Sequence, residues 1–174
     1  MLVVQAEAAS WLPSLFDGPH RELVMSSPVP TAIVRPGADD GSKVVLALHS
    51  SQARQPTSAA LNAAHLTVRL GRGRSVTVVA PHTLAPELAA ILDGVEVIEA
   101  DPAQWIRSGT NGPVTVVIPG GRNGALGSAR LARDAAIGGA TVITVADRAS
   151  TSRLAGGSRL SDLGVSTRTT GAAG

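Results

Sequence analysis

The stretch 114–148, "VTVVIPGGRNGALGSARLARDAAIGGATVITVADR", contains an apolar run, a glycine-rich turn, a helical pattern and a second apolar run. Gly127 and Ser128 open the helical pattern shortly after the turn. This order is typical of parallel α/β proteins, in which backbone N–H groups at the start of such a helix face a phosphate. The stretch therefore predicts a strand–turn–helix–strand unit, and it raises the question of whether the turn binds a nucleotide.

Apolar runs of the same kind recur along the chain. They are nearly continuous rather than alternating, as expected for strands that are buried on both faces. From Lys43 to Ala146 they alternate with helical patterns, which predicts a doubly wound, mostly parallel α/β sheet. The expected strands are 2–6, 31–35, 43–48, 75–80, 95–99, 113–119 and 140–146, and the expected helices are 56–71, 84–94, 102–109 and 127–139.

Composition narrows the class of protein. Hydrophobic residues make up 44% of the 174 residues but aromatic residues only 2%, so the core must consist of Val, Leu, Ile and Ala. Cysteine is absent, which excludes disulfides and thiolate metal sites and fits a reducing cytoplasm. The net charge is only +2 and no dense run of basic residues occurs, so nucleic-acid binding has little support. No segment approaches the roughly 20 apolar residues that span a bilayer, and we expect a soluble, cytoplasmic chain.

A partial internal repeat is visible in the sequence. Residues 1–36 have the same order as 114–148, with Gly18 in the place of Gly127. A strand–helix–strand unit cannot bury its faces alone, so it must pack on the rest of the chain, on another chain or on further sequence. We expect a partial repeat over 1–36, a linker over 37–42, a complete α/β domain over 43–147 and a flexible Ser/Thr/Gly/Arg-rich tail over 148–174.

Several segments resemble the universal stress protein family. "SSPVPTAIVRP" (26–36) resembles the end of such a domain, and "KVVLALHSS" (43–51) resembles its opening strand. "GSARLARDAAIGGATVITVADR" (127–148) resembles the closing helix and strand, as does the segment 18–36. The resemblance covers about 1–36 and 43–147. It implies a Rossmann-like, HUP-type sheet of five mostly parallel strands with helices on both faces, and paired domains, either between chains or in tandem.

The resemblance also implies where a nucleotide binds. In the nucleotide-binding members, adenine and ribose lie near an aspartate that ends the first strand, followed by a glycine and a serine. Here His49 takes the position of the aspartate, Ser50 takes that of the glycine, and Ser51 matches. The family's phosphate loop reads G-x2-G-x9-G-(S/T), but in this chain only two residues separate Gly124 from Gly127.

The candidate nucleotide site has two interpretations. In the first, free N–H groups of the loop hold the phosphates of ATP or AMP. In the second, which we favour because the acidic partner is missing, the loop is a tight strand-to-helix turn and His49 caps a helix or faces solvent. We expect no catalytic or metal-binding residues, because the histidines are scattered and no hydrolase or kinase motif occurs. The candidate residues are His49, Ser50, Ser51, Gly121, Asn123, Gly124, Gly127 and Ser128.

These observations lead to three functional hypotheses. The first is a non-catalytic, universal-stress-protein-like module of regulation or assembly, with weak or absent nucleotide binding. It would form a homodimer or pair with a tandem domain through the final strands, 31–35 and 141–145. The second is an adenine-nucleotide-binding stress sensor. The third is the cytosolic regulatory domain of a cation/proton antiporter, which would act on a membrane transporter without itself inserting into the bilayer.

Overall fold

The computed structural model describes residues 1–5, 16, 21, 24–25, 27, 29–34, 42–109, 113–120, 125–146 and 167–169. The strands are β1 (Leu2–Gln5), β2 (Thr31–Val34), β3 (Lys43–Ala47), β4 (Ser75–Ala80), β5 (Glu96–Glu99), β6 (Val114–Pro119), β7 (Thr141–Val145) and β8 (Thr167–Thr169). The helices are α3 (Ser50–Arg54), α4 (Ser58–Leu70), α5 (Pro86–Ile91), α6 (Pro102–Arg107) and α7 (Ala125–Ile137). All seven expected strands and all four expected helices are present, and α3 was not foreseen.

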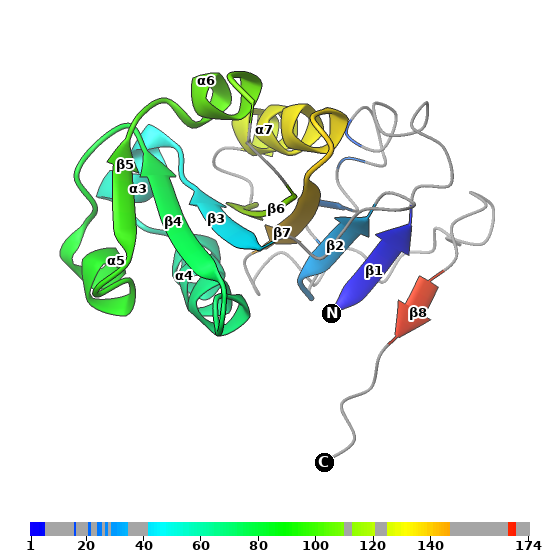
Figure 1. Cartoon of the computed structure of the whole chain (residues 1–174), viewed down its shortest axis with the longest axis horizontal. Helices are drawn as coiled ribbons and strands as arrows, with labels where there is room; N and C mark the ends of the chain where they lie inside the picture. Colours follow the sequence, from blue (N-terminus) through cyan, green and yellow to red (C-terminus); the bar gives the residue numbers. More distant parts are fainter. Residues whose placement is uncertain are drawn as a thin grey trace, which may run out of the picture.

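The strands form one sheet in the order β5-β4-β3-β6-β7-β2-β1-β8 (Figure 1). Strands β3 to β7 are mutually parallel, which confirms an α/β fold with a mostly parallel sheet. The expected number of five strands is wrong. The sheet does not end at β7, because β2 pairs with the outer edge of β7 and β1 pairs with β2. Seven strands of four to six residues and the three-residue β8 therefore share one sheet.

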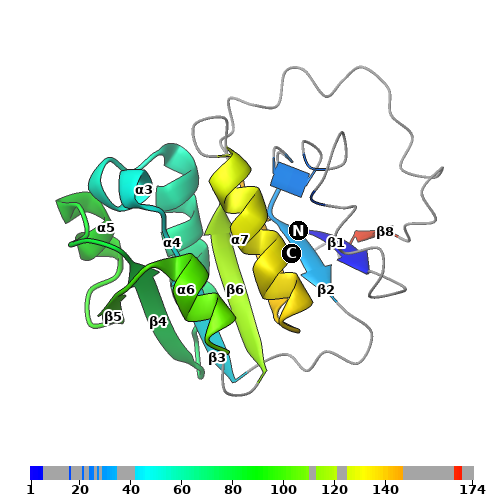
Figure 2. The ribbon, with the colours of Figure 1, turned by 90° about the horizontal axis from the view of Figure 1, so that it is seen from above.

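Helices cover both faces of the sheet. Figures 1 and 2 show α6 and α7 on one face and α4 and α5 on the other. Each face has its own core of buried Val, Leu, Ile and Ala side chains. Alternate residues of β3 enter different cores, Val45 on the α7 face and Val44 and Leu46 on the α4 face, and all three are fully buried. The nearly continuous apolar runs of the sequence reflect this burial on both faces.

The longest described helices pack through small side chains. Helix α4 begins after Thr57, whose Oγ1 accepts a hydrogen bond from the Ala60 N–H at 3.3 Å, as its sequence predicts. The helix ends at Gly71, where a Cβ atom would overlap the side chain of Val76.

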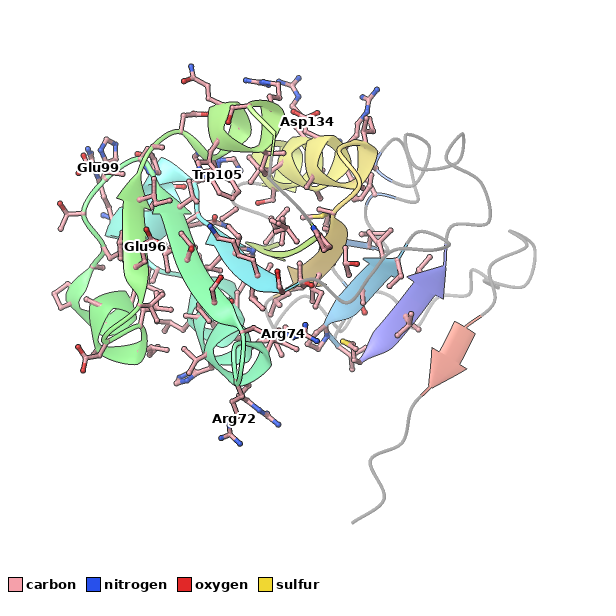
Figure 3. All side chains as sticks on the ribbon, in the orientation of Figure 1. Arg72, Arg74, Glu96, Glu99, Trp105 and Asp134 are labelled. Atoms are coloured by element: carbon pink, nitrogen blue, oxygen red, sulfur yellow. The ribbon has the colours of Figure 1, made fainter. Side chains whose placement is uncertain are left out.

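On α6, Trp105 (labelled in Figure 3) packs against the α7-face core, and the Lys43 ammonium lies 5.7 Å from its ring centroid. Trp105 thus serves as a packing anchor.

The first part of the chain is joined to the rest by buried contacts. Val24 and Met25 are buried helical residues of the α7-face core. The Thr144 hydroxyl on β7 donates a buried hydrogen bond of 2.8 Å to the Val24 carbonyl oxygen. The Met25 carbonyl oxygen lies so close to Gly120 that a Cβ atom there would overlap it. These contacts fasten the N-terminal segment to the ends of β6 and β7.

The two strands that we expected to mediate dimerisation pair with each other inside one chain. Thr31 faces Thr144, Ala32 faces Ile143 and Ile33 faces Val142, in antiparallel register. The other edges of β2 and β7 are taken by β1 and β6. A homodimer through the edges of these strands would have to break this pairing, so a homodimer of the chain stays a prediction that needs another surface.

The expected domain boundaries fall largely outside the described residues. This holds for the linker over 37–42, apart from Ser42, and for most of the tail over 148–174. Within the tail, Thr167–Thr169 forms β8, which pairs antiparallel with β1. The boundaries themselves stay predictions.

The buried bond between β7 and the N-terminal segment can be tested by substitution. Thr144→Val keeps the shape of the side chain but leaves the Val24 carbonyl without its donor, so we expect the free energy of unfolding to fall by about 1–3 kcal/mol in urea titrations. Thr141→Val, the same change at the half-buried start of β7, is the control. Equal losses in the two variants would show that this bond does not hold the segment.

Candidate functional site

The predicted site residues lie at the carboxyl ends of the parallel strands, where open α/β sheets bind ligands. His49, Ser50 and Ser51 follow β3, and His49 is the N-cap residue of α3. Gly127 and Ser128 lie in the first turn of α7, which follows β6. The structure thus brings these two groups of the prediction together. Gly121, Asn123 and Gly124 lie outside the described residues.

A glutamine that the sequence analysis did not single out fixes the start of α3. Gln52 is 3% exposed, and its Oε1 accepts a hydrogen bond of 3.1 Å from the His49 N–H. Its Nε2 donates a buried bond of 3.2 Å to the carbonyl oxygen of Pro119, the last residue of β6. One amide side chain therefore joins the end of β3 to the end of β6 and sets the position of His49.

The imidazole ring of His49 lies against the first turn of α7. A Cβ atom built on Gly127 would lie 3.0 Å from His49 Nε2 and 3.1 Å from Cε1, which is tighter than most real contacts. The glycine at 127 therefore leaves room for the ring. Gly127 does not adopt a positive φ, and the described glycines that do are Gly73, Gly94, Gly109 and Gly139. The space that glycine opens at this position is filled by a side chain of the same protein.

Two buried polar atoms at the site have no hydrogen-bond partner within the described part of the chain. They are His49 Nε2 and Ser128 Oγ, and Ser128 is fully buried. Buried polar atoms nearly always have a partner, and an orphaned one costs about 1–3 kcal/mol. Both orphans belong to residues that the sequence marked as candidates, so this end of the sheet carries hydrogen-bonding capacity that the described part of the chain does not use.

A hollow of about 590 Å³ lies beside these residues. It is lined by His49, Ser50, Ser51, Arg54, Gln55 and Gly127. The hydroxyls of Ser50 and Ser51 and the guanidinium of Arg54 are exposed, so this surface offers donors and one positive charge to an anion. Its chemistry is that of a weak anion-binding surface. The described residues include no group of three or more His, Asp or Glu side chains that could hold a metal ion.

Gly120, at the end of β6, is also occupied by the protein. Its N–H donates a hydrogen bond of 2.7 Å to the Val145 carbonyl oxygen, and a Cβ atom built on Gly120 would overlap the Met25 carbonyl oxygen. Gly120, which immediately precedes the predicted phosphate loop, therefore serves the packing of the N-terminal segment. Both described glycines of this turn and helix start, Gly120 and Gly127, are required by neighbouring parts of the chain.

Sequence reasoning missed Gln52 and Arg54. A weak signal for Gln52 existed, because a glutamine three residues after an N-cap is the spacing of a capping box. From the sequence, His49 was allowed to cap a helix, and it is the N-cap residue of α3, but no helix was expected after it because histidine is not a usual N-cap residue. Arg54 carried no signal, since its place at the hollow depends on the unforeseen helix α3.

The comparisons with known proteins add no family. No protein-family model matches this chain, and no curated protein matches it. The resemblance to universal stress proteins therefore stays a prediction. Within the described residues, no helix combines the length and apolar character that crossing a bilayer requires.

The contact between His49 and Gly127 predicts a coupled pair of substitutions. Gly127→Ala should lower the free energy of unfolding by about 1–2 kcal/mol, because the new methyl group displaces the imidazole. In a His49→Ala background the same change should cost nothing or stabilise by up to ~1 kcal/mol, because alanine favours the helix. Denaturant unfolding of the four proteins measures the coupling. A penalty that is the same in both backgrounds would contradict the contact.

Proposed function

We propose that this chain is a non-catalytic, universal-stress-protein-like module of regulation or assembly, with weak or absent nucleotide binding. In this proposal the complete unit is a doubly wound, HUP-type α/β domain that acts in the cytoplasm. The partial unit 1–36 is its tandem partner. The chain works by presenting a surface to other proteins rather than by converting a substrate.

The proposal rests on the observation that other parts of the protein fill the space at both described glycines of the site. A phosphate cradle needs backbone that a ligand can approach closely, which is why its loop is rich in glycine. At Gly127 the approach is taken by the His49 ring, and at Gly120 it is taken by the Met25 carbonyl. The carboxylate that would bind a ribose is replaced by His49. These features support a site whose glycines have been kept for packing and whose affinity for nucleotides is low.

The sheet supports the assembly part of the proposal. The final strands of the two repeat units, β2 and β7, pair antiparallel and merge both units into one sheet. Such a pairing suits the tandem arrangement that the resemblance implies. In this arrangement the strands of both units form one structural framework, and the surfaces of that framework carry the function.

An adenine-nucleotide sensor remains the second candidate, because a specific observation favours it. The hollow of about 590 Å³ places Arg54 and two serine hydroxyls beside His49, whose buried Nε2 lacks a partner in the described residues. A ligand with an anionic group would satisfy several of these groups together.

Calorimetric titration with ATP, AMP and a cyclic dinucleotide separates the two candidates. We expect the unaltered chain to bind none of them more tightly than about 1 mM. His49→Ala removes the ring that covers Gly127, so we expect it to improve the affinity for ATP at least ~10-fold if the rest of the cradle is intact.

His65→Ala, on the exposed side of α4, is the control for the loss of a histidine and should leave binding unchanged. Micromolar binding by the unaltered, folded chain would overturn the proposal and establish the sensor. No binding by either protein, with the fold intact by circular dichroism, would support the assembly function and would show that the cradle is lost beyond the single ring.

A further inference from the structure

The strands near the two edges of the sheet differ in chemical character. At one edge, β5 is mostly exposed and carries Glu96 and Glu99 (labelled in Figure 3), and such charges protect an edge strand from further pairing. Near the other edge, β1 begins Leu2-Val3-Val4 and carries no charge. Leu2 and Val4 pack into the α7-face core and Val3 packs against the α4-face core. Strand β1 therefore has the character of an interior strand.

The repeat identifies which interior strand β1 corresponds to. Gly18 and Gly127 are equivalent in the repeat, and counting forward without a gap makes Ile33 equivalent to Val142. These two residues face each other in the β2–β7 pairing and enter the same core. A local two-fold axis therefore passes through this pair and relates β2 to β7 and β1 to β6.

The register of the strands extends this relation. In the first unit, Thr31 of β2 pairs with Leu2 of β1. In the second unit, the residue equivalent to Thr31 lies at the start of β7, which pairs with the start of β6. Leu2 thus corresponds to Val114, and Val4 corresponds to Val116. All four side chains lie on the same face of the sheet, which agrees with the two-fold relation. The strand that pairs with Val114 and Val116 of β6 therefore indicates which kind of strand fits beside β1.

The outer edge of β6 holds β3, whereas the outer edge of β1 holds β8. Strand β3 runs parallel to β6 over four residue pairs, from Lys43–Val114 to Leu46–Val117, and is apolar on both faces. Strand β8 is the three-residue segment Thr-Arg-Thr, which runs antiparallel to β1. A short polar strand thus covers an edge that, by the internal symmetry, fits a longer apolar strand in the parallel direction.

Among the described residues, one face of this region has less helical cover than its counterpart. Helix α4, which follows β3, packs on β3, β6 and β7. On the equivalent face of the first unit, Val3 and Val34 are only half-buried, and none of the helices α3 to α7 makes extensive contacts with β1 or β2. A strand added to β1 and followed by a helix would complete both the edge and this face.

We propose that the outer edge of β1 is a docking site for a strand of a partner polypeptide, which displaces β8 and pairs parallel to β1. The partner strand is apolar on both faces, as β3 is, and is followed by a helix that covers Val3 and Val34. Its register on β1 is the register of β3 on β6, so Leu2 faces the position of Lys43 and Val4 faces that of Val45. The inference does not depend on whether the chain binds a nucleotide.

Disulfide trapping tests the direction and register directly, because the chain has no cysteine of its own. The probe is a synthetic peptide with the sequence of residues 42–50, SKVVLALHS, carrying either Lys43→Cys or Val45→Cys. The full-length chain carries either Leu2→Cys or Val4→Cys. We expect the pairs 2–43 and 4–45 to cross-link at least ~10-fold more than the pairs 2–45 and 4–43, because only directly opposed Cβ atoms come within disulfide distance.

The role of β8 has its own matched pair of variants. Arg168→Pro removes a backbone donor from the middle of β8 and should raise the cross-linking yield several-fold. Arg153→Pro makes the same change in the tail outside β8 and should leave the yield unchanged. Circular dichroism and thermal unfolding establish that each variant is folded. In the cysteine-free chain, protection of the β1 amides from hydrogen exchange by the unmodified peptide gives a second readout.

Three outcomes would overturn the inference. Preferential cross-linking of 2–45 and 4–43 would mean that the edge accepts an antiparallel strand. A dominant disulfide between two copies of the Leu2→Cys chain, in place of the peptide adduct, would mean that the occupant is a second copy. No cross-linking in the Arg168→Pro variant, together with unchanged hydrogen exchange at β1, would mean that the edge does not take a strand.

Discussion

The antiparallel pairing of β2 with β7 is the constraint on which the rest of the structure depends. Parallel strands joined by helices can continue a sheet, but each new parallel strand needs a crossover connection. By reversing direction at this junction, the chain joins β1 and β2 to the parallel strands β3 to β7 without such a connection and leaves neither β2 nor β7 with a free edge. Ile33 and Val142 face each other in this junction and are buried in one core. The continuous core of the α7 face, and the place of the N-terminal segment on it, follow from this single pairing.

The junction also shapes the predicted ligand end of the sheet. Because β2 lies beside β7, the helical residues that precede it reach over the end of β6, where the Met25 carbonyl lies against Gly120. The Thr144 hydroxyl completes the contact by binding the Val24 carbonyl. On the other side of β6, Gln52 links Pro119 to the backbone of His49. Neighbouring parts of the chain thus pack against Gly120 from one side and against Gly127 from the other, and these contacts account for both glycines without a ligand.

The fold could be predicted further than the site. The apolar runs and helical patterns between Lys43 and Ala146 are long and periodic, so the elements and the parallel sheet followed from residue types alone. The final strands 31–35 and 141–145 were expected to mediate association between domains, but their antiparallel register within one chain could not be foreseen, because the pairing of Thr31 with Thr144 is a long-range event without a local pattern. At the site, the positions of His49 and Gly127 were predicted, but their mutual contact was not. It depends on α3, a five-residue helix too short to give a periodic signal.

The junction between β2 and β7 has a consequence for the order in which the protein is made. Thr31 lies 113 residues before Thr144, so a ribosome that adds 5–20 residues per second completes the first strand of this pair about 6–23 s before its partner. During that interval the segment that will become β1 and β2 has no sheet to join. Its apolar side chains therefore stay outside the sheet while the part of the chain from β3 onward is synthesised. The pairing of β2 with β7 can form only after residues 141–145 have been synthesised, so the apolar side chains of β1 and β2 stay exposed to chaperones and to aggregation while β3 to β6 are made.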